Sequence, residues 1–318
     1  MTILKENVNN KSISRIVLGT MIINMQKKEE SFALLDAAYE CGINAFDTGA
    51  VYSGGDSERC LGAWCVERNI RDRIFILDKG CHPNADRRRV TEFDLAADLY
   101  DALARLQTDF IDLYMLHRDD TSVPVEPIVE ALNEHLAAGR IGSYGVSNWS
   151  LDRIKQATRY AEEHNLTPIA ASSPNYGLAE QVENPWGPGC VSLSGPDHTA
   201  DRSWYEKTRM PVFAYSSLGR GLFSGRLTRD NYKDVADGAC QKAYCHEVNF
   251  QRLDRAMEMA QQKSVSVAQL ALAFVLNSHM RTFALVGAAT REEIEQCVAA
   301  QNIELSDDEL NWLEEETT

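Results

Sequence analysis

The sequence predicts a single (β/α)8 barrel over residues 1–318, and three observations support this prediction. Eight short apolar runs rich in β-branched and aromatic residues follow one another along the chain. Segments with helical periodicity separate most of these runs, and no linker-like stretch divides the chain. Strands that alternate with helices form parallel βαβ units, and eight such units favour a closed barrel over an open sheet.

The predicted strands are short, as expected for a buried parallel sheet. They cover Arg15–Thr20, Asn44–Thr48, Ile74–Lys79, Ile111–His117, Gly142–Ser147, Ile169–Ser173, Pro211–Ser216 and Phe283–Val286. Apolar residues recur at helical spacing in 29–41, 92–106 and 126–138, and Gly139 is a stop signal for the last of these helices. Ser150 is the expected N-cap of the next helix, and Ser306 with Glu309 predicts a capping box.

The first turn argues against an open dinucleotide-binding sheet. Such a sheet carries G-x-G-x-x-G after its first strand, but this chain has Gly19-Thr20-Met21-Ile22-Ile23-Asn24 there. Two later stretches, Gly177–Thr208 and Gly219–Phe250, are too long to be simple connections. They predict long loops after strands six and seven, where loops of a barrel usually build the functional face.

Charge and cysteine content exclude several classes of protein. The net charge of −15 disfavours nucleic acid as a partner, because nucleic-acid binding requires a basic surface. No apolar run is long enough for a membrane span, and residues 1–12 lack the apolar core of a signal peptide. The scattered cysteines, such as Cys41, Cys60 and Cys65 in apolar helical stretches, favour reduced buried thiols in a cytoplasmic protein.

No metal site is expected. Cys240-x4-Cys245-His246 is the one grouping that resembles metal ligands, but its spacing fits no standard zinc pattern and no second pair lies nearby.

Ionisable residues stand where three successive predicted strands end. Asp47 lies at the end of the second strand, Lys79 ends the third and His117 ends the fourth, while Tyr52 follows Asp47 by five residues. Each residue alone is compatible with a structural role. Because the carboxyl ends of barrel strands share one rim, all four side chains are expected to lie close together there. Crowding ionisable groups in this way is costly and points to a functional site.

This set of residues suits proton donation to a carbonyl oxygen. A tyrosine hydroxyl becomes a better acid when a cation stabilises its phenolate, so Lys79 is expected to lower the pKa of Tyr52. Asp47 would hold Lys79 in place and keep it protonated. His117 would hydrogen-bond the substrate oxygen and orient it. The arrangement lacks a nucleophile and requires no metal, and it suits protonation of a carbonyl oxygen as a hydride reaches the carbonyl carbon.

The ordered set of motifs resembles the aldo-keto reductase superfamily over roughly residues 13–300. The catalytic tetrad of that family matches Asp47, Tyr52, Lys79 and His117. Other similar stretches are Gly19-Thr20 and residues 52–58, 112–118, 139–148, 214–221 and 267–273.

The resemblance implies a bound NADP(H) or NAD(H) and assigns residues to it. Ser147 and Asn148 match the pair that binds the carboxamide of the nicotinamide. Tyr215 matches the aromatic residue that stacks on the nicotinamide ring. Gly287 to Gln296 match the segment that binds the adenosine end. The full expected cofactor set is Gly19, Thr20, Met21, Ser147, Asn148, Ser173, Tyr215, Ser216, Leu218, Arg220, Gly287, Arg291, Glu293 and Gln296.

Three departures from the family pattern concern the cofactor. Ser173 stands where the family usually has Gln, and Cys297 where it usually has Asn beside the adenine. Ala289 and Glu293 occupy positions that often carry the cations for a 2′-phosphate, and Arg291 is the nearest cation. We therefore expect weak discrimination between NADPH and NADH.

The substrate is expected to be a small carbonyl or alcohol, with a sugar or sugar-derived carbonyl favoured. The candidates for its pocket are Met21, His82, Arg118, Asp119, Trp149 and Trp186, of which Trp149, Arg118 and Trp186 are the main ones. Trp186 could equally pack its own loop. Neither a partner protein nor an oligomeric state is indicated.

Two other functions are compatible with the same fold. A non-catalytic nucleotide-binding subunit is disfavoured by the intact set of four residues, and carbonyl reduction would decide. A metal-dependent hydrolase is disfavoured by the few His and carboxylate pairs at strand ends, and metal analysis would decide.

Overall fold

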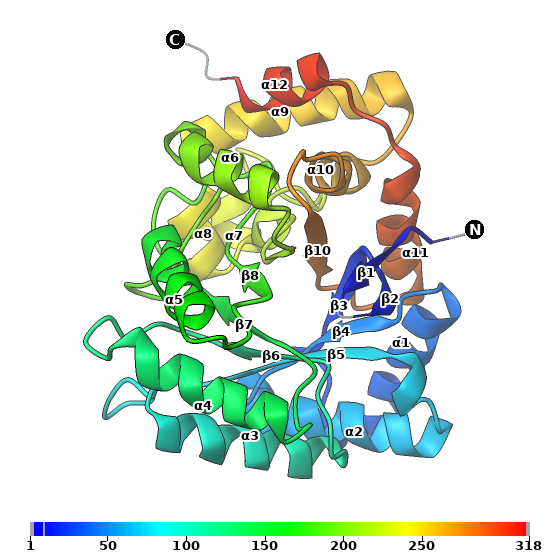
Figure 1. Cartoon of the computed structure of the whole chain (residues 1–318). Coiled ribbons are helices and arrows are strands. Elements are labelled where there is room, and N and C mark those ends of the chain that lie inside the picture. Colours follow the sequence, from blue (N-terminus) through cyan, green and yellow to red (C-terminus); the bar gives the residue numbers. More distant parts are fainter. Residues whose placement is uncertain (1–2, 9, 316–318) are drawn as a thin grey trace. The chain divides into compact units, whose positions relative to one another are not determined.

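The computed structural model of this chain describes residues 3–8 and 10–315. Parallel strands form a closed barrel in the order β10-β3-β4-β5-β6-β7-β8-β9, which confirms the predicted (β/α)8 fold (Figure 1). Each barrel strand overlaps a predicted run. The strands are β3 (Ile16–Gly19), β4 (Ala45–Asp47), β5 (Phe75–Gly80), β6 (Leu113–Leu116), β7 (Tyr144–Ser147), β8 (Ala171–Ser173), β9 (Val212–Ala214) and β10 (Thr282–Val286).

The chain divides into two compact units. The first comprises Met1–Ser173 with Gly287–Arg291, and the second comprises Pro174–Val286 with Glu292–Thr318. The expectation that residues 1–318 form one domain stays a prediction.

In the first unit, helices cover the outer side of strands β3 to β8 (Figure 1). They are α1 (Lys28–Glu40), α2 (Asp56–Arg68), α3 (Glu92–Leu106), α4 (Val125–Ala137) and α5 (Leu151–Glu163). The predicted apolar faces are turned inward, since Leu35, Leu99 and Leu132 are buried. Ser150 caps α5 by accepting a hydrogen bond from the Arg153 amide, as the sequence predicted.

An antiparallel hairpin, β1 (Lys5–Val8) with β2 (Lys11–Ser14), precedes the barrel and was not predicted. The Ser14 amide donates to Asn44 Oδ1 at 2.8 Å, which ties the hairpin to the start of β4. The buried cysteines include Cys60 and Cys65 as expected, whereas Cys41, at the exposed end of α1, is only half-buried.

In the second unit, both long connections contain helices. The first contains α6 (Thr199–Thr208), and the second contains α7 (Tyr232–Val235), α8 (Gly238–Tyr244), α9 (Glu247–Lys263) and α10 (Val267–Leu276). The chain ends with α11 (Arg291–Ala299) and α12 (Asp307–Glu314), and Ser306 and Glu309 form the predicted capping box. None of the helices in the described residues has the length and hydrophobicity needed to cross a membrane.

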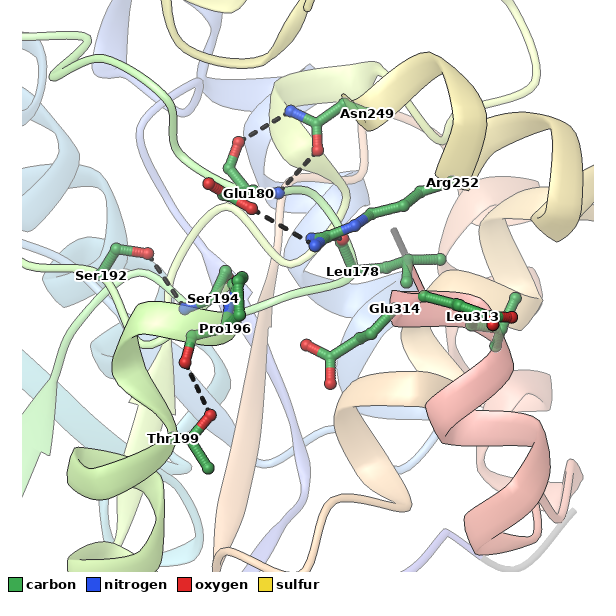
Figure 2. A network of polar contacts seen from close by, with 12 residues as sticks. Leu178, Glu180, Ser192, Ser194, Pro196, Thr199, Asn249, Arg252, Leu313 and Glu314 are labelled. Carbon is green, nitrogen blue, oxygen red and sulfur yellow. Dashed lines mark hydrogen bonds and ion pairs between the residues drawn. The ribbon is translucent and has the colours of Figure 1, made fainter. Parts of the chain in front are cut away.

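Two buried side chains of α9 hold the connection that follows β8 (Figure 2). Asn249 accepts a hydrogen bond from the Glu180 amide and donates one to the Glu180 carbonyl, both at 2.7 Å. Arg252 donates to the Leu178 carbonyl at 3.1 Å and pairs with the Glu180 carboxylate at 3.3 Å. These bonds satisfy buried backbone groups that a loop cannot satisfy by itself, so this part of the connection is held in one conformation.

The two faces of β5 carry different chemistry because side chains alternate along a strand. Lys79 and Leu77 share one face, and Asp78 lies on the other face with Tyr114 of β6, its register partner. Asp78 and Glu58 are fully buried, and among the described residues no hydrogen bond of ordinary length and angle reaches either Asp78 oxygen. Burial first, and then the Glu58 carboxyl, raise the pKa of Asp78 well above its ordinary value. Asp78 therefore keeps its proton in the folded chain.

Replacing Asp78 with asparagine should flatten the pH dependence of stability. The folded wild type holds a proton that the unfolded chain releases, so its free energy of unfolding falls as pH rises above about 4, by up to about 1.4 kcal/mol per pH unit. Asp78→Asn removes this loss. Urea unfolding from about pH 5 to about pH 8 measures how the free energy of unfolding depends on pH. Asp72→Asn, at an exposed position, is the control. Parallel profiles for wild type and Asp78→Asn would show that Asp78 is ionised in the folded chain.

Candidate functional site

Asp47, Lys79 and Tyr52 form a buried cluster at the ends of β4 and β5. Lys79 Nζ forms a close ion pair with Asp47 Oδ1 and donates a hydrogen bond to the Tyr52 hydroxyl at 3.1 Å. The Tyr52 hydroxyl in turn lies 3.4 Å from Asp47 Oδ2. Lys79 and Asp47 are buried, so the pair is protected from the solvent screening that weakens surface ion pairs.

Local backbone geometry brings Tyr52 back over the strand ends. The chain turns immediately after β4, where the Ala50 amide donates to the Lys79 carbonyl at 2.8 Å. A Cβ on Gly49 would lie 3.3 Å from Lys79 Cβ, so glycine permits this close approach. Tyr52 begins the short helix η2 (Tyr52–Gly55), in which Ser53 and Gly54 adopt positive φ angles of 51° and 63°.

His117 lies directly beside this cluster. Its ring is buried and packs edge-on against the Tyr52 ring, with 5.8 Å between the ring centroids. Burial, followed by the charges of Lys79 and its other neighbours, lowers the pKa of His117 well below its ordinary value. The imidazole is therefore neutral at neutral pH.

The expected lowering of the Tyr52 pKa is wrong in its net direction. Lys79 does lower the pKa, but burial and the Asp47 carboxylate raise it more, to about 12. Burial alone would lower the pKa of Lys79, but Asp47 and Tyr52 outweigh it and raise that pKa overall. Tyr52 is thus a neutral phenol held beside a permanent ammonium group.

The ends of β7 and β8 bring together three residues of the expected cofactor set. Ser147 Oγ donates to the Ser173 carbonyl at 2.9 Å, and Asn148 Nδ2 donates to Ser147 Oγ at 2.9 Å. Asn148 adopts a φ of 58°, which turns its side chain back toward Ser147. After β3, Thr20 is fully buried and bonded to the Asp47 carbonyl, whereas Met21 is 57% exposed.

Two of the expected substrate residues lie near the end of β6. Trp149 is only 2% exposed, its indole N–H lies 3.4 Å from the Arg118 carbonyl, and the Arg153 guanidinium covers its ring. Its indole thus has almost no surface left for a substrate. Arg118 is half-buried, and Arg153 pairs with Asp119 at 3.3 Å.

In the second unit, Trp186 contacts residues expected to bind the cofactor. Its ring lies 5.8 Å from that of Tyr215, and the Arg220 guanidinium lies 5.2 Å above it. Arg220 also pairs with Asp237 at 2.7 Å, and its buried Nε has no partner in the described part of the chain. Trp186 thus lies beside two residues expected to bind the cofactor, and its expected substrate role stays a prediction.

The loop around Arg220 has an unusual backbone. Ser216 and Arg220 adopt φ angles of 54° and 51°, and the Gly219 amide donates to the Ser216 carbonyl at 2.8 Å. Leu218 precedes the short helix η5 (Gly219–Gly221).

The expected adenosine segment begins directly after β10. A Cβ added to Gly287 would meet no atom within 4 Å, so space lies beside this backbone. Arg291 forms an ion pair with Glu40 of α1. Farther along α11, Glu293 is half-buried and Gln296 is exposed. Cys297 is buried.

The cysteine motif of α8 is a thiol pair. Cys240 Sγ and Cys245 Sγ lie 3.9 Å apart, and His246 Nε2 is bonded to the Lys242 carbonyl. No group of three potential metal ligands occurs in residues 3–8 and 10–315.

A comparison with protein families identifies this arrangement. The model of the aldo/keto reductase family matches residues 15–316. The chain belongs to the aldo/keto reductase family. It is a nicotinamide-dependent oxidoreductase, as the sequence resemblance implied.

Similar proteins and structures agree with this assignment. The chain is 26% identical to norsolorinic acid reductase stcV of Emericella nidulans, over 95% of this chain and 78% of that protein. It is 27% identical to versiconal hemiacetal acetate reductase of Aspergillus parasiticus, over 95% and 93% of the two chains. An aldo-keto reductase from Klebsiella pneumoniae, solved in complex with NADPH, superposes with a TM-score of 0.74 at 26% identity, covering 98% and 94%.

Two features of this aldo/keto reductase were missed by sequence reasoning. Asp237, which caps α8 and pairs with Arg220, carried only the ordinary signal of a helix N-cap. The buried Glu58 and Asp78 carboxyls gave no signal, because charged residues are rarely buried and nothing in the local pattern marks the exception.

The neutral state of His117 can be tested by nuclear magnetic resonance. We expect its imidazole nitrogens to show the neutral form throughout the range from about pH 5.5 to about pH 8. In Lys79→Met the loss of the neighbouring cation should move the pKa of His117 upward. A fully protonated His117 at about pH 6 in the wild type would contradict the electrostatics described above.

Proposed function

We propose that this chain transfers hydride between NADP(H) or NAD(H) and a carbonyl or alcohol, with Tyr52 as proton donor and Asp47, Lys79 and His117 as its partners. The observation that carries the proposal is the position of Lys79 Nζ, in contact with both Asp47 and the Tyr52 hydroxyl. The neutral His117 beside Tyr52 completes the set.

The chemistry follows from the charge state of each group. The nicotinamide, when bound, supplies the hydride. As the carbonyl oxygen gains negative charge, the Tyr52 phenol donates its proton to it, and Lys79 stabilises the resulting phenolate. His117 holds the same oxygen by a hydrogen bond. Asp47 keeps Lys79 charged and fixed, so Asp47 acts as a positioning residue.

Features of both units are compatible with the cofactor that the family implies. In the first unit, Met21 offers exposed apolar surface and Gly287 adjoins open space. In the second unit, the unpartnered Nε of Arg220 is a charged donor that suits a pyrophosphate oxygen. Tyr215 and Trp186 provide aromatic surface beside Arg220. We therefore assign Ser147, Asn148 and Tyr215 to the nicotinamide, and Ser216, Leu218 and Arg220 to the pyrophosphate.

A hydroxylated carbonyl, such as a sugar or sugar-derived carbonyl, is the proposed substrate. Polar groups surround His117, including His82 and Arg118, and such groups pair with substrate hydroxyls. An aldo/keto reductase from Klebsiella pneumoniae that is similar to this chain was solved in complex with NADP and acetate. We propose the cytoplasm as the location, because all eight cysteines are free thiols.

Tyr52→Phe tests the proton donor. We expect it to lower kcat for carbonyl reduction at least about a hundredfold, because the donor is removed, while cofactor affinity changes less than about twofold. Tyr100→Phe, at an exposed position of α3, is the matched control. Turnover by Tyr52→Phe within about threefold of wild type would contradict the assignment. Lys79→Met should also be severely impaired, because the pKa of Tyr52 would then rise further.

Cofactor preference should be weak because, in the part of the chain that the structure describes, the cation nearest in sequence to the expected 2′-phosphate position already has an acidic partner. Arg291 is paired with Glu40, and Glu293 would repel a phosphate dianion but can accept a bond from a free 2′-hydroxyl. We expect NADH to bind at least as well as NADPH, within about tenfold. Fluorescence quenching by each reduced cofactor measures the two dissociation constants.

The variant Glu40→Gln isolates the contribution of Arg291. Releasing Arg291 should strengthen NADPH binding by up to about fivefold, the size of an exposed ion pair, with NADH binding unchanged. Glu29→Gln on the same helix is the control. A wild-type preference for NADPH above about a hundredfold would show that the 2′-phosphate lies elsewhere.

A further inference from the structure

A second histidine lies against His117 and has no part in the proposed proton transfer. His82 follows β5 by two residues, and its ring centroid lies 4.9 Å from that of His117, with the planes at 75°. The His117 ring thus has Tyr52 and His82 as aromatic neighbours. A molecule that binds to the His117 ring therefore has the His82 ring as a neighbour.

The hydrogen bonding of His82 defines what its free nitrogen can do. Nδ1 lies 2.8 Å from the Pro83 carbonyl oxygen, which can only accept, so Nδ1 carries the proton. Burial and the Arg118 charge lower the pKa of His82, so the ring is neutral. Nε2 is then a lone-pair acceptor. It has no hydrogen-bond partner within the described ranges and is not one of their buried polar atoms.

We propose that His82 is a specificity-determining residue, whose Nε2 accepts a hydrogen bond from a hydroxyl on the carbon next to the reacting carbonyl. The substrates so selected are α-hydroxy carbonyl compounds, and their reduction products are vicinal diols. This inference rests on the proposed function, because it requires the carbonyl oxygen to bind at His117.

The distance between the rings determines which hydroxyl can bind. Each hydrogen bond spans roughly 2.8 Å from nitrogen to oxygen. With 4.9 Å between the ring centroids, nitrogens of the two rings that face one bound molecule contact oxygens that are near neighbours in it. Oxygens on adjacent carbons meet this requirement. A substrate without the hydroxyl leaves the Nε2 acceptor desolvated and unpaired, and such an unpaired group is what makes a site reject an analogue.

Two ketones of equal size test the proposal. Hydroxyacetone and butanone differ only in a hydroxyl against a methyl group beside the carbonyl carbon. We expect the wild type to favour hydroxyacetone in kcat/KM by roughly tenfold, the effect of about one hydrogen bond. His82→Phe keeps an aromatic ring but loses the acceptor. In this variant the ratio of kcat/KM for hydroxyacetone to kcat/KM for butanone should fall to about one.

Two further variants separate this role from a structural one. His82→Gln, which can offer a side-chain oxygen as acceptor, should retain part of the preference, and His164→Phe at the exposed end of α5 should retain all of it. If His82 merely supports His117, His82→Phe will slow both ketones equally and the ratio will not change. That result would overturn the proposal.

A binding measurement keeps the inference testable without turnover. With oxidised cofactor present, hydroxyacetone should shift the ¹⁵N resonance of His82 Nε2 and butanone should not. If the wild type reduces neither ketone, the proposed function fails for small ketones. The ¹⁵N resonance of His82 Nε2 then still decides the role of His82. An Nε2 resonance that hydroxyacetone leaves unmoved would overturn the proposal.

Discussion

A buried ion pair between Lys79 and Asp47 joins the ends of β4 and β5, and the geometry of the candidate site depends on it. Either charge alone would be costly at a position removed from water, so each requires the other. The pair also fixes the third member, because Lys79 and Asp47 both contact the Tyr52 hydroxyl. Burial first, and then the same positive charge, lower the pKa of His117 and keep it neutral. Four residues from separate segments thus share one electrostatic arrangement.

Each of the two units has a structural support of its own. Alternation along β5 places Lys79 on one face and the protonated Asp78 on the other, so a single strand serves both the site and the packing of the helices. In the second unit, Asn249 and Arg252 hold the connection after β8 through buried hydrogen bonds (Figure 2). Buried hydrogen bonds of this kind hold a loop in one conformation.

Sequence patterns predicted the barrel and the convergence of the four residues, because parallel strands place their carboxyl ends on one rim. The β1–β2 hairpin was not predicted, since its short polar strands lack a clear alternation. The contact of Trp186 with Arg220 lies between two irregular loops, where no periodicity applies. The direction of the Tyr52 pKa shift could not be predicted without knowing that Tyr52 is buried, because proximity to Lys79 alone suggested a lowered pKa.

The most direct test of the proposed role of the ion pair is the alkaline limb of the pH–rate profile for carbonyl reduction, compared between wild type and Asp47→Asn. The wild-type rate should stay level through about pH 9, because Tyr52, with a pKa of about 12, keeps its proton. Asp47 raises the pKa of Tyr52, so removing its charge should move the alkaline limb to lower pH. Circular dichroism would confirm that the variant is folded. An alkaline limb at the same pH in both proteins would contradict the account.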